Sequence, residues 1–124
     1  MKLFTIEEAN DLLLDIRPKL EKIRDCYAAA QALRESAKAA AKVSDFGGGM
    51  EGGTNYVTSL YEIGKLTTEL NGLGIQLKNY SRGLIDFPCQ RNGQIILLCW
   101  QLGEGDEIRW WHEIEAGFAG RMPL

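Results

Sequence analysis

The chain has 124 residues, of which 45% are hydrophobic and 25% charged, a composition typical of one globular domain with its own core. Its net charge of −3 argues against a general nucleic-acid binder, because such proteins are usually basic. The longest strongly apolar run, residues 95–100, is far too short to cross a bilayer, so we expect no membrane span.

The first predicted element is a long helix, Ile6–Val43. Thr5 and Glu8 have the spacing of a capping box, in which each side chain accepts a hydrogen bond from the other residue's amide. Pro18 lies inside the pattern and predicts a kink, because proline lacks an amide hydrogen and clashes with the preceding turn. The apolar positions keep heptad spacing on both sides of it: Ile6, Ala9, Leu13, Ile16, Leu20, Ile23, Tyr27 and Ala30.

A glycine-rich segment, residues 46–53, predicts a loop between the first helix and a second one at 55–71. The loop lacks the GKS or GKT ending of a phosphate-binding loop, so we do not assign it that role. The second helix is about half as long as the first and should cover only its C-terminal half. The apolar stripe of residues 6–20 must then be buried by the rest of the chain.

The rest of the chain predicts an antiparallel meander. Four strands are expected at 75–80, 84–90, 94–102 and 107–112, followed by an irregular tail at 113–124. Asn92 and Gly93 form the dipeptide of a tight type I′ hairpin turn. The predicted fold is therefore α+β and a single domain, 1–124: a long antiparallel helical hairpin, 5–74, packed on a small β unit with its tail, 75–124.

The hairpin turn sets a register for the second and third strands. It pairs Cys89 with Ile96 and Phe87 with Leu98 on a wholly apolar face that should pack on the helices. The third strand is apolar on both faces, so something must also cover its other side. We expect the tail to cover part of it and a second copy of the protein to cover the rest. We therefore predict a homodimer or higher oligomer that uses this face, the long helix, or both.

The spacing of candidate ligands along the sequence does not indicate a metal site or a cofactor site. His112 is the only histidine, and Cys26, Cys89 and Cys99 form no CxxC pair. We therefore expect no metal and no cofactor. The odd count of cysteines and the absence of a signal-peptide pattern at residues 1–10 favour reduced thiols and a cytoplasmic protein. We expect His112 to hydrogen-bond to the backbone or to Glu104.

A four-residue loop before the fourth strand pairs Leu98 with Trp111, so Trp111 should face the helices and His112 the opposite side. Asp86 shares that opposite, largely apolar side and needs a partner there. Arg121 from the returning tail is the candidate. An Asp86–Arg121 pair would be a structural latch or an anion-binding site.

Five segments of the chain together suggest a known family. They are FTIEEAN at 4–10, GLIDFP at 83–88, LCW at 98–100, WH at 111–112 and GFAGR at 117–121. In this combination the chain resembles the uncharacterised bacterial domain-of-unknown-function family 2203. The loop at 103–108 is slightly longer than the family's pattern. The resemblance implies a bacterial cytoplasmic protein and carries no activity.

Two functional interpretations follow. The favoured one is a non-enzymatic oligomeric module that binds a protein partner or scaffolds an assembly, with no role for nucleic acid or membrane. The alternative is a small-molecule or anion-binding protein, which could be an enzyme, with a site near the 103–106 loop. Its candidate ligand-binding residues are Asp86, Glu104, Trp110, Trp111, His112 and Arg121.

Overall fold

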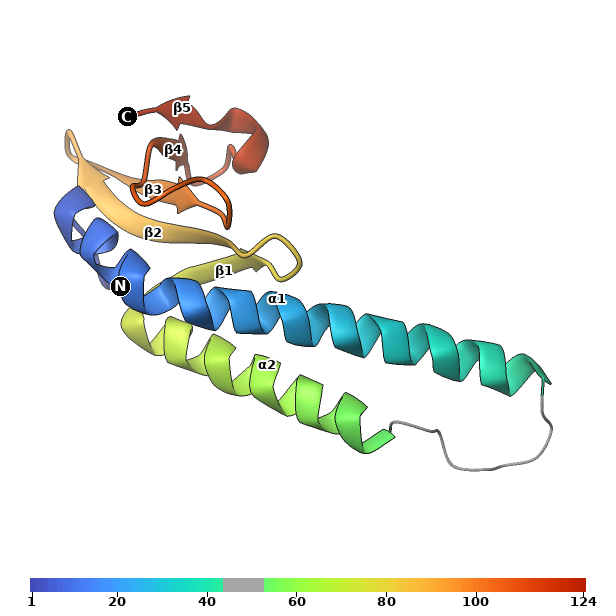
Figure 1. Cartoon of the computed structure of the whole chain (residues 1–124). Coiled ribbons are helices and arrows are strands. Elements are labelled where there is room, and N and C mark those ends of the chain that lie inside the picture. Colours follow the sequence, from blue (N-terminus) through green and yellow to red (C-terminus); the bar gives the residue numbers. More distant parts are fainter. Residues whose placement is uncertain (44–52) are drawn as a thin grey trace.

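A computed structural model of the protein describes residues 1–43 and 53–124. Two helices, α1 (Ile6–Val43) and α2 (Gly53–Leu73), precede a five-stranded sheet (Figure 1). The predicted loop at 46–53 lies outside the described residues, except Gly53, which begins α2. The strands are β1 (Gln76–Asn79), β2 (Leu84–Arg91), β3 (Gln94–Trp100), β4 (Trp110–Glu113) and β5 (Met122–Pro123), with a 3-10 turn η1 (Phe118–Gly120) before β5.

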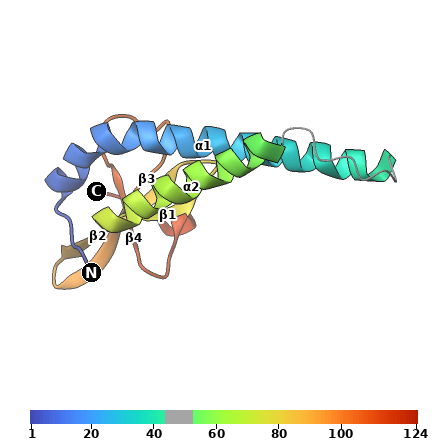
Figure 2. The same cartoon turned by 90° about the horizontal axis from the view of Figure 1, so that it is seen from below.

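Helix α1 forms as its sequence predicts. The Thr5 amide donates to Glu8 at 3.1 Å and the Glu8 amide donates to the Thr5 hydroxyl at 3.0 Å, which completes the capping box. Pro18 lies within one continuous helix. The first, blue part of α1 runs at an angle to the remainder in two perpendicular views (Figure 1, Figure 2). The helix is therefore bent rather than split in two.

Helices α1 and α2 form the predicted antiparallel hairpin, but their overlap differs from the prediction. Lys19 pairs with Glu69 at 3.0 Å, and Arg34 donates to the Tyr56 hydroxyl at 3.2 Å. Helix α2 therefore lies along the middle of α1, and the C-terminal end of α1 extends beyond it (Figure 1). The expectation of overlap with the C-terminal half was wrong, because it assumed a short connection that keeps the facing helix ends level.

The sheet is an antiparallel meander with the strand order β1-β2-β3-β4-β5. Asn92 and Gly93 adopt φ values of 52° and 76°, as a type I′ turn requires, and the predicted pairings of Cys89 with Ile96 and Phe87 with Leu98 are confirmed. The main differences from the prediction lie in the last three strands. Strand β3 ends at Trp100 rather than at residue 102, strand β4 begins at Trp110 rather than at residue 107, and the tail contains β5, which pairs with β4.

One face of the sheet, the inner face, packs on the hairpin and forms the core. Of the stripe at residues 6–20, Ala9, Leu13, Ile16 and Leu20 are buried there, as expected, whereas Ile6 at its start is 38% exposed. Each fully buried aliphatic or aromatic side chain contributes about 1.5–3 kcal/mol through removal of its surface from water. The main contributors are Leu13, Ile16 and Leu20 of α1, Leu70 of α2, and Ile85, Phe87, Leu98 and Trp100 of the sheet.

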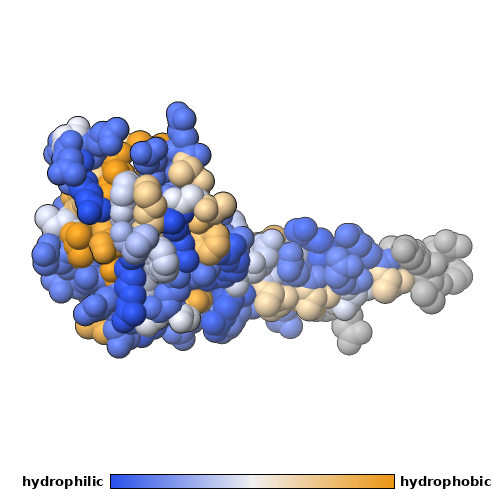
Figure 3. All heavy atoms as spheres, turned by 90° about the horizontal axis from the view of Figure 1, so that it is seen from above, coloured by the Kyte–Doolittle hydropathy of each residue, from blue (hydrophilic) through white to orange (hydrophobic). Residues whose placement is uncertain are grey.

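The opposite side of the sheet, the outer face, is covered by the chain's own tail. Leu97 and Cys99 on this face are only 4% and 1% exposed. Ile114 and Phe118 of the tail lie around the same small cavity as these two residues. The tail therefore covers the middle of β3, as predicted, while Ile95 at the start of the strand is 40% exposed. The body formed by the sheet and tail lies at one end of the molecule, and the hairpin projects from it (Figure 3).

Neither helix in the described ranges, 1–43 and 53–124, combines the length and the apolarity needed to cross a membrane.

Candidate functional site

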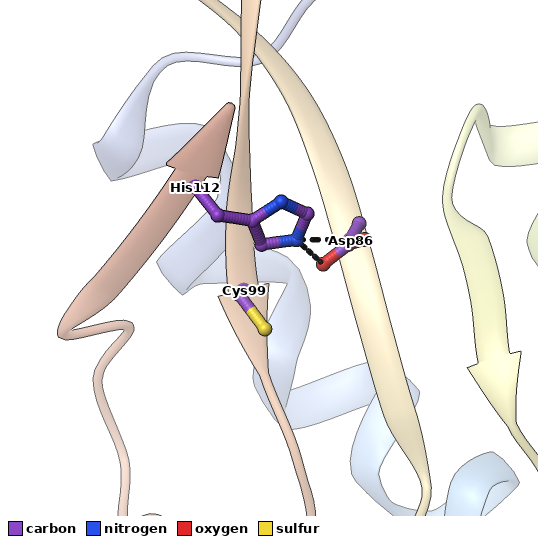
Figure 4. A group of neighbouring side chains, drawn as sticks. All are labelled: Asp86, Cys99 and His112. Atoms are coloured by element: carbon purple, nitrogen blue, oxygen red, sulfur yellow. Dashed lines mark hydrogen bonds and ion pairs between the residues drawn. The ribbon is translucent and has the colours of Figure 1, made fainter. Parts of the chain in front are cut away.

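Three side chains that can act as ligands or take part in proton transfer meet on the outer face. Strands β2, β3 and β4 pair Asp86 with Cys99 and Leu97 with His112. Because side chains alternate between the two faces of a strand, Asp86, Cys99 and His112 all project to the outer side. Figure 4 shows the three side chains converging from adjacent strands. We call them the Asp86–Cys99–His112 cluster, and each of the three residues is at most 2% exposed.

The imidazole of His112 has a close polar neighbour at each of its two ring nitrogens. Its Nδ1 lies 2.7 Å from the Glu113 carbonyl oxygen, and its Nε2 lies 3.1 Å from each Asp86 carboxylate oxygen. A carbonyl oxygen can only accept, so Nδ1 carries a hydrogen and donates it. In a neutral imidazole Nε2 is then an acceptor facing an acceptor. The contact between His112 and Asp86 therefore requires a further proton or another cation.

The Cys99 thiol is the third member of the cluster. Burial raises its pKa from about 9 to about 12, and the negative charge of Asp86 adds to the shift. A neighbouring Arg121 guanidinium, with Nη1 3.9 Å from the sulfur, acts in the opposite direction. At neutral pH the thiol of the free protein is protonated and is a poor nucleophile. The cluster is therefore not an activated Cys–His pair of the kind found in cysteine proteases.

Beside the cluster, Arg121 and Glu104 form an ion pair with a separation of 2.9 Å between Nη1 and the carboxylate. Glu104 also accepts a hydrogen bond from the Gln101 amide at 2.9 Å. The Arg121 guanidinium lies over the rings of Trp110 and Phe118, at 4.9 and 4.1 Å from their centroids. The loop after β3 and the turn before β5 are thereby tied together.

The predicted pairing of Asp86 with Arg121 is wrong. In the structure Asp86 contacts His112 and Arg121 pairs with Glu104, so the four residues form two separate pairs. The register brings His112 within reach of Asp86 from the opposite side of β3. Glu104 of the 103–106 loop lies within ion-pair distance of the Arg121 guanidinium, so Arg121 pairs with Glu104. Of the two partners considered for His112, the backbone is the observed one, and Glu104 is not.

A small cavity opens beside the cluster. Its volume is about 150 Å³, and the outer face of the sheet and the tail enclose it together. At about 30 Å³ for each water in the liquid, this space is equivalent to roughly five waters. Its walls combine the three polar side chains of the cluster with apolar ones, and an exposed lysine lies at its rim. The lining residues are Lys78, Leu84, Asp86, Leu97, Cys99, His112, Ile114, Gly117 and Phe118.

Comparison with known proteins agrees with the resemblance seen in the sequence. The family model described as an uncharacterized conserved protein, DUF2203, matches residues 2–124. The chain belongs to the DUF2203 family. Neither the search of curated proteins nor the search of solved structures finds a match. The family's description names no activity, so the function of this DUF2203 chain has to be argued from its own geometry.

The six candidate residues of the DUF2203 chain fall into three places. Asp86 and His112 belong to the cluster. Glu104, Arg121 and Trp110 form the neighbouring ion pair and its aromatic platform. Trp111 packs against the core on the inner face, as predicted, with the Arg91 guanidinium 5.0 Å from its ring centroid. The candidate site therefore excludes Trp111.

Sequence reasoning missed Cys99 as a site residue. The signal was present, because the same register that paired Cys89 with Ile96 also places Cys99 opposite Asp86 on the outer face. The predicted register put Cys99 on the same face as His112 and Asp86, but we did not count its thiol among the candidate site residues. We also judged metal ligands by their spacing along the chain, which does not reveal donors brought together by three neighbouring strands.

A larger hollow of about 510 Å³ lies at the other end of the sheet, where the N-terminal segment meets the β2–β3 hairpin and the C-terminal residue. Its walls are mainly apolar, with Leu3, Ile6 and Leu124 among them. Its charged lining residues, Glu7 and Arg91, are exposed. It lacks the convergence of buried polar groups that marks the smaller cavity, so we place the candidate site at the smaller one.

Proposed function

We propose that this DUF2203 chain is a small-ligand-binding protein and that its site is the cavity over the Asp86–Cys99–His112 cluster. The observation that carries the proposal is a buried, hydrogen-bonded carboxylate and imidazole that line a cavity. Buried ionisable side chains of this kind cluster at functional sites. A concave space with a few convergent polar groups is the usual form of a ligand site.

Stability alone gives little reason for this pair of residues. Replacing a buried ion pair with apolar side chains of similar volume is often neutral or stabilising by about 1–4 kcal/mol. The outer face around Asp86 and His112 is otherwise apolar, with Leu84 and Leu97 close by. An apolar pair would therefore suit the fold at least as well. A role in binding accounts for polar side chains at these two positions.

The cavity volume limits the ligand. Drug-sized ligands and cofactors occupy pockets of about 300–1,000 Å³. A cavity of about 150 Å³ has room for an ion with a few waters or for a molecule of several heavy atoms. Nucleotides and larger cofactors are excluded from the site in this conformation.

A cavity-filling variant tests the proposal. Leu97→Phe should reduce the space beside the cluster, and Ile95→Phe is the matched control because Ile95 lies on the same face of β3 outside the cavity lining. Thermal unfolding is followed with a panel of small ligands: phosphate, acetate, other short carboxylates and divalent transition-metal ions. A ligand at a hundred times its Kd stabilises by about 2.7 kcal/mol, which corresponds to roughly 10 °C in Tm.

We expect at least one ligand of the panel to raise the Tm of the wild type and of Ile95→Phe, and to have little effect on Leu97→Phe. A panel that leaves the wild-type Tm unchanged would contradict the proposal. So would a ligand that stabilises Leu97→Phe as strongly as the wild type. Circular dichroism first establishes that both variants keep the fold.

A second proposal is that the protein assembles into a homo-oligomer, or binds a protein partner, through its helical hairpin. The observation that favours it is a group of exposed apolar side chains on one face of α2. Val57, Leu60 and Tyr61 are 65%, 44% and 67% exposed and have the i, i+3, i+4 spacing of neighbours on a helix surface. Because the tail covers Leu97, the hairpin is now the better candidate interface than the outer face of β3.

Light scattering at micromolar to tens of micromolar concentration tests the assembly. We expect a mass above the 13.8 kDa of one chain and a shift toward that mass in Tyr61→Lys. Ile95→Lys is the control, since Ile95 is an exposed apolar residue of the sheet. A wild-type mass of one chain over the whole range would refute the homo-oligomer.

We place the protein in the cytoplasm as part of this proposal. Its three cysteines, Cys26, Cys89 and Cys99, are all free thiols, which suits a reducing compartment.

A further inference from the structure

We propose that the Asp86–Cys99–His112 cluster binds a divalent transition-metal ion of the Zn²⁺ class, with one coordination position open to the cavity. The inference rests on the proposed function, that this cavity is a ligand site, and names the class of ligand. It departs from our expectation from the sequence, which considered only the spacing of donors along the chain.

The geometry of the donors comes first. One carboxylate oxygen, one thiol sulfur and one ring nitrogen lie within 4.8 Å of one another, on three adjacent strands. In a tetrahedral zinc site with bonds of about 2.0–2.3 Å, neighbouring ligand atoms are separated by roughly 3.3–3.6 Å. The 3.1 Å between His112 Nε2 and Asp86 is close to that separation. The other separations, up to 4.8 Å, have to shorten by at most about 1.2 Å for the three donors to share one centre.

The second observation is the orientation of the His112 ring. Its Nδ1 donates to the Glu113 carbonyl oxygen at 2.7 Å, so in the neutral imidazole the Nε2 lone pair is directed at the Asp86 carboxylate. A metal-binding histidine almost always donates its other ring nitrogen's hydrogen to a carbonyl or carboxylate, because this fixes the tautomer. A cation between Nε2 and the carboxylate removes the clash of two acceptors.

The chemistry of the donors selects the class of metal. Mg²⁺ and Ca²⁺ prefer oxygen ligands, and one carboxylate with a sulfur and an imidazole is a poor set for either. Zinc and related ions accept a mixed nitrogen, oxygen and sulfur set. Binding releases the Cys99 proton to solvent, and the resulting thiolate and the carboxylate together balance the two positive charges. The Arg121 guanidinium, 3.9 Å from the sulfur, lies beside the metal-bound thiolate.

Three protein ligands leave a tetrahedral ion with one open position. The cavity of about 150 Å³ borders all three ligands and has room for a water or a small ligand there. Structural zinc sites are usually closed by four protein ligands, whereas three ligands and an open position mark sites that bind or activate a further molecule. The arrangement therefore assigns the site to binding rather than to holding the fold together.

Cobalt binding tests the inference. The full chain is purified without a histidine tag, stripped of metal with a chelator and titrated with Co²⁺, because a cobalt–thiolate bond gives a charge-transfer absorption. We expect this absorption to saturate at one Co²⁺ per chain and to disappear when Zn²⁺ displaces the cobalt. Cys99→Ser should abolish it. Cys89→Ser is the matched control, since Cys89 is also a buried thiol but lies outside the cluster.

Competition with a zinc indicator gives the affinity. Asp86→Asn and His112→Gln should each weaken Zn²⁺ binding by at least about a hundredfold, since loss of even an outer-shell partner costs 10- to 100-fold. A folded wild type without cobalt–thiolate absorption overturns the inference, and so does an absorption that survives in Cys99→Ser. If Cys99→Ser fails to fold, zinc X-ray absorption of the wild type decides. One sulfur at about 2.3 Å supports the site, and no sulfur or several sulfurs overturn it.

The two proposals fail in distinguishable ways. Absence of metal binding, together with a small organic ligand or anion that stabilises the wild type but not Leu97→Phe, refutes the metal site and supports the ligand-binding function. Absence of both responses refutes both.

Discussion

Removing Arg121 should show how strongly the tail is tied to the sheet. Arg121→Ala deletes the ion pair with Glu104, the stacking on Trp110 and Phe118, and the contact with Cys99. The side chains of Arg121 and Glu104 are only 13% and 18% exposed. The variant therefore leaves a largely buried carboxylate that keeps its hydrogen bond from the amide of Gln101.

The size of the effect follows from these contacts. Breaking a fully buried pair by removing one partner costs about 3–5 kcal/mol, and exposed pairs contribute about 0–1 kcal/mol. For a pair that is mostly but not fully buried we expect about 2–3 kcal/mol for Arg121→Ala. In a chain of this size that corresponds to a fall in Tm of roughly 8–12 °C. Because the pair is shielded from solvent, added salt should change the effect only slightly.

Arg82→Ala is the matched control. Arg82 also lies 4.1 Å from the Phe118 ring centroid, but it is exposed and its side chain donates to the neutral Gln101 rather than to a carboxylate. We expect it to cost less than about 1 kcal/mol. Urea unfolding of Arg121→Ala, Glu104→Gln and the double variant gives the coupling energy. A coupling below about 0.3 kcal/mol, or an equal cost for Arg82→Ala, would refute the reasoning.

Three further predictions concern stability and are measured by urea or thermal unfolding. Leu20→Ala, at a residue that is 0% exposed, should cost about 2–5 kcal/mol, whereas Leu14→Ala at 76% exposure should stay within about 0.5 kcal/mol; equal costs would contradict the assigned core. Hydrogen bonds with Thr5 lower the pKa of Glu8, so the stabilising effect of its carboxylate is complete above about pH 4.5 and is lost as pH falls through that lowered pKa. Glu8→Gln should remove this part of the acid dependence of stability. An unchanged acid profile in the variant would argue against the capping box. Gly83→Ala should destabilise by about 1–3 kcal/mol, because φ is +60° there and a Cβ would lie 2.6 Å from a neighbouring side chain; a neutral result would contradict the described turn.

Local patterns in the sequence were enough for most of the fold. Both helices, the continuity of the first one through Pro18, and the Asn92–Gly93 hairpin were predicted from capping, heptad spacing and turn chemistry. The expected four-residue loop before the fourth strand also placed Trp111 toward the core and His112 on the outer face, and these two pairings are observed. These features depend on residues a few positions apart, or on one turn that fixes all the pairings beyond it.

The overlap of the helices and the extra strand β5 were not predicted. Both depend on contacts between segments far apart in the sequence. Lys19 of α1 faces Glu69 of α2, and β5 of the tail pairs with β4. No short-range periodicity encodes such contacts, because they are decided by the packing of those segments.

The partners of the charged residues were decided by the tertiary structure alone. The sequence determined that Asp86 lies on a largely apolar face and needs a partner, but Arg121 was the only candidate taken from it. That Asp86 contacts His112, and that Arg121 pairs with Glu104, depends on how the side chains of three strands and the tail converge. The same convergence adds Cys99 to the site. Side chains that touch across strands are neighbours in space only, so their chemistry appears once the sheet has formed.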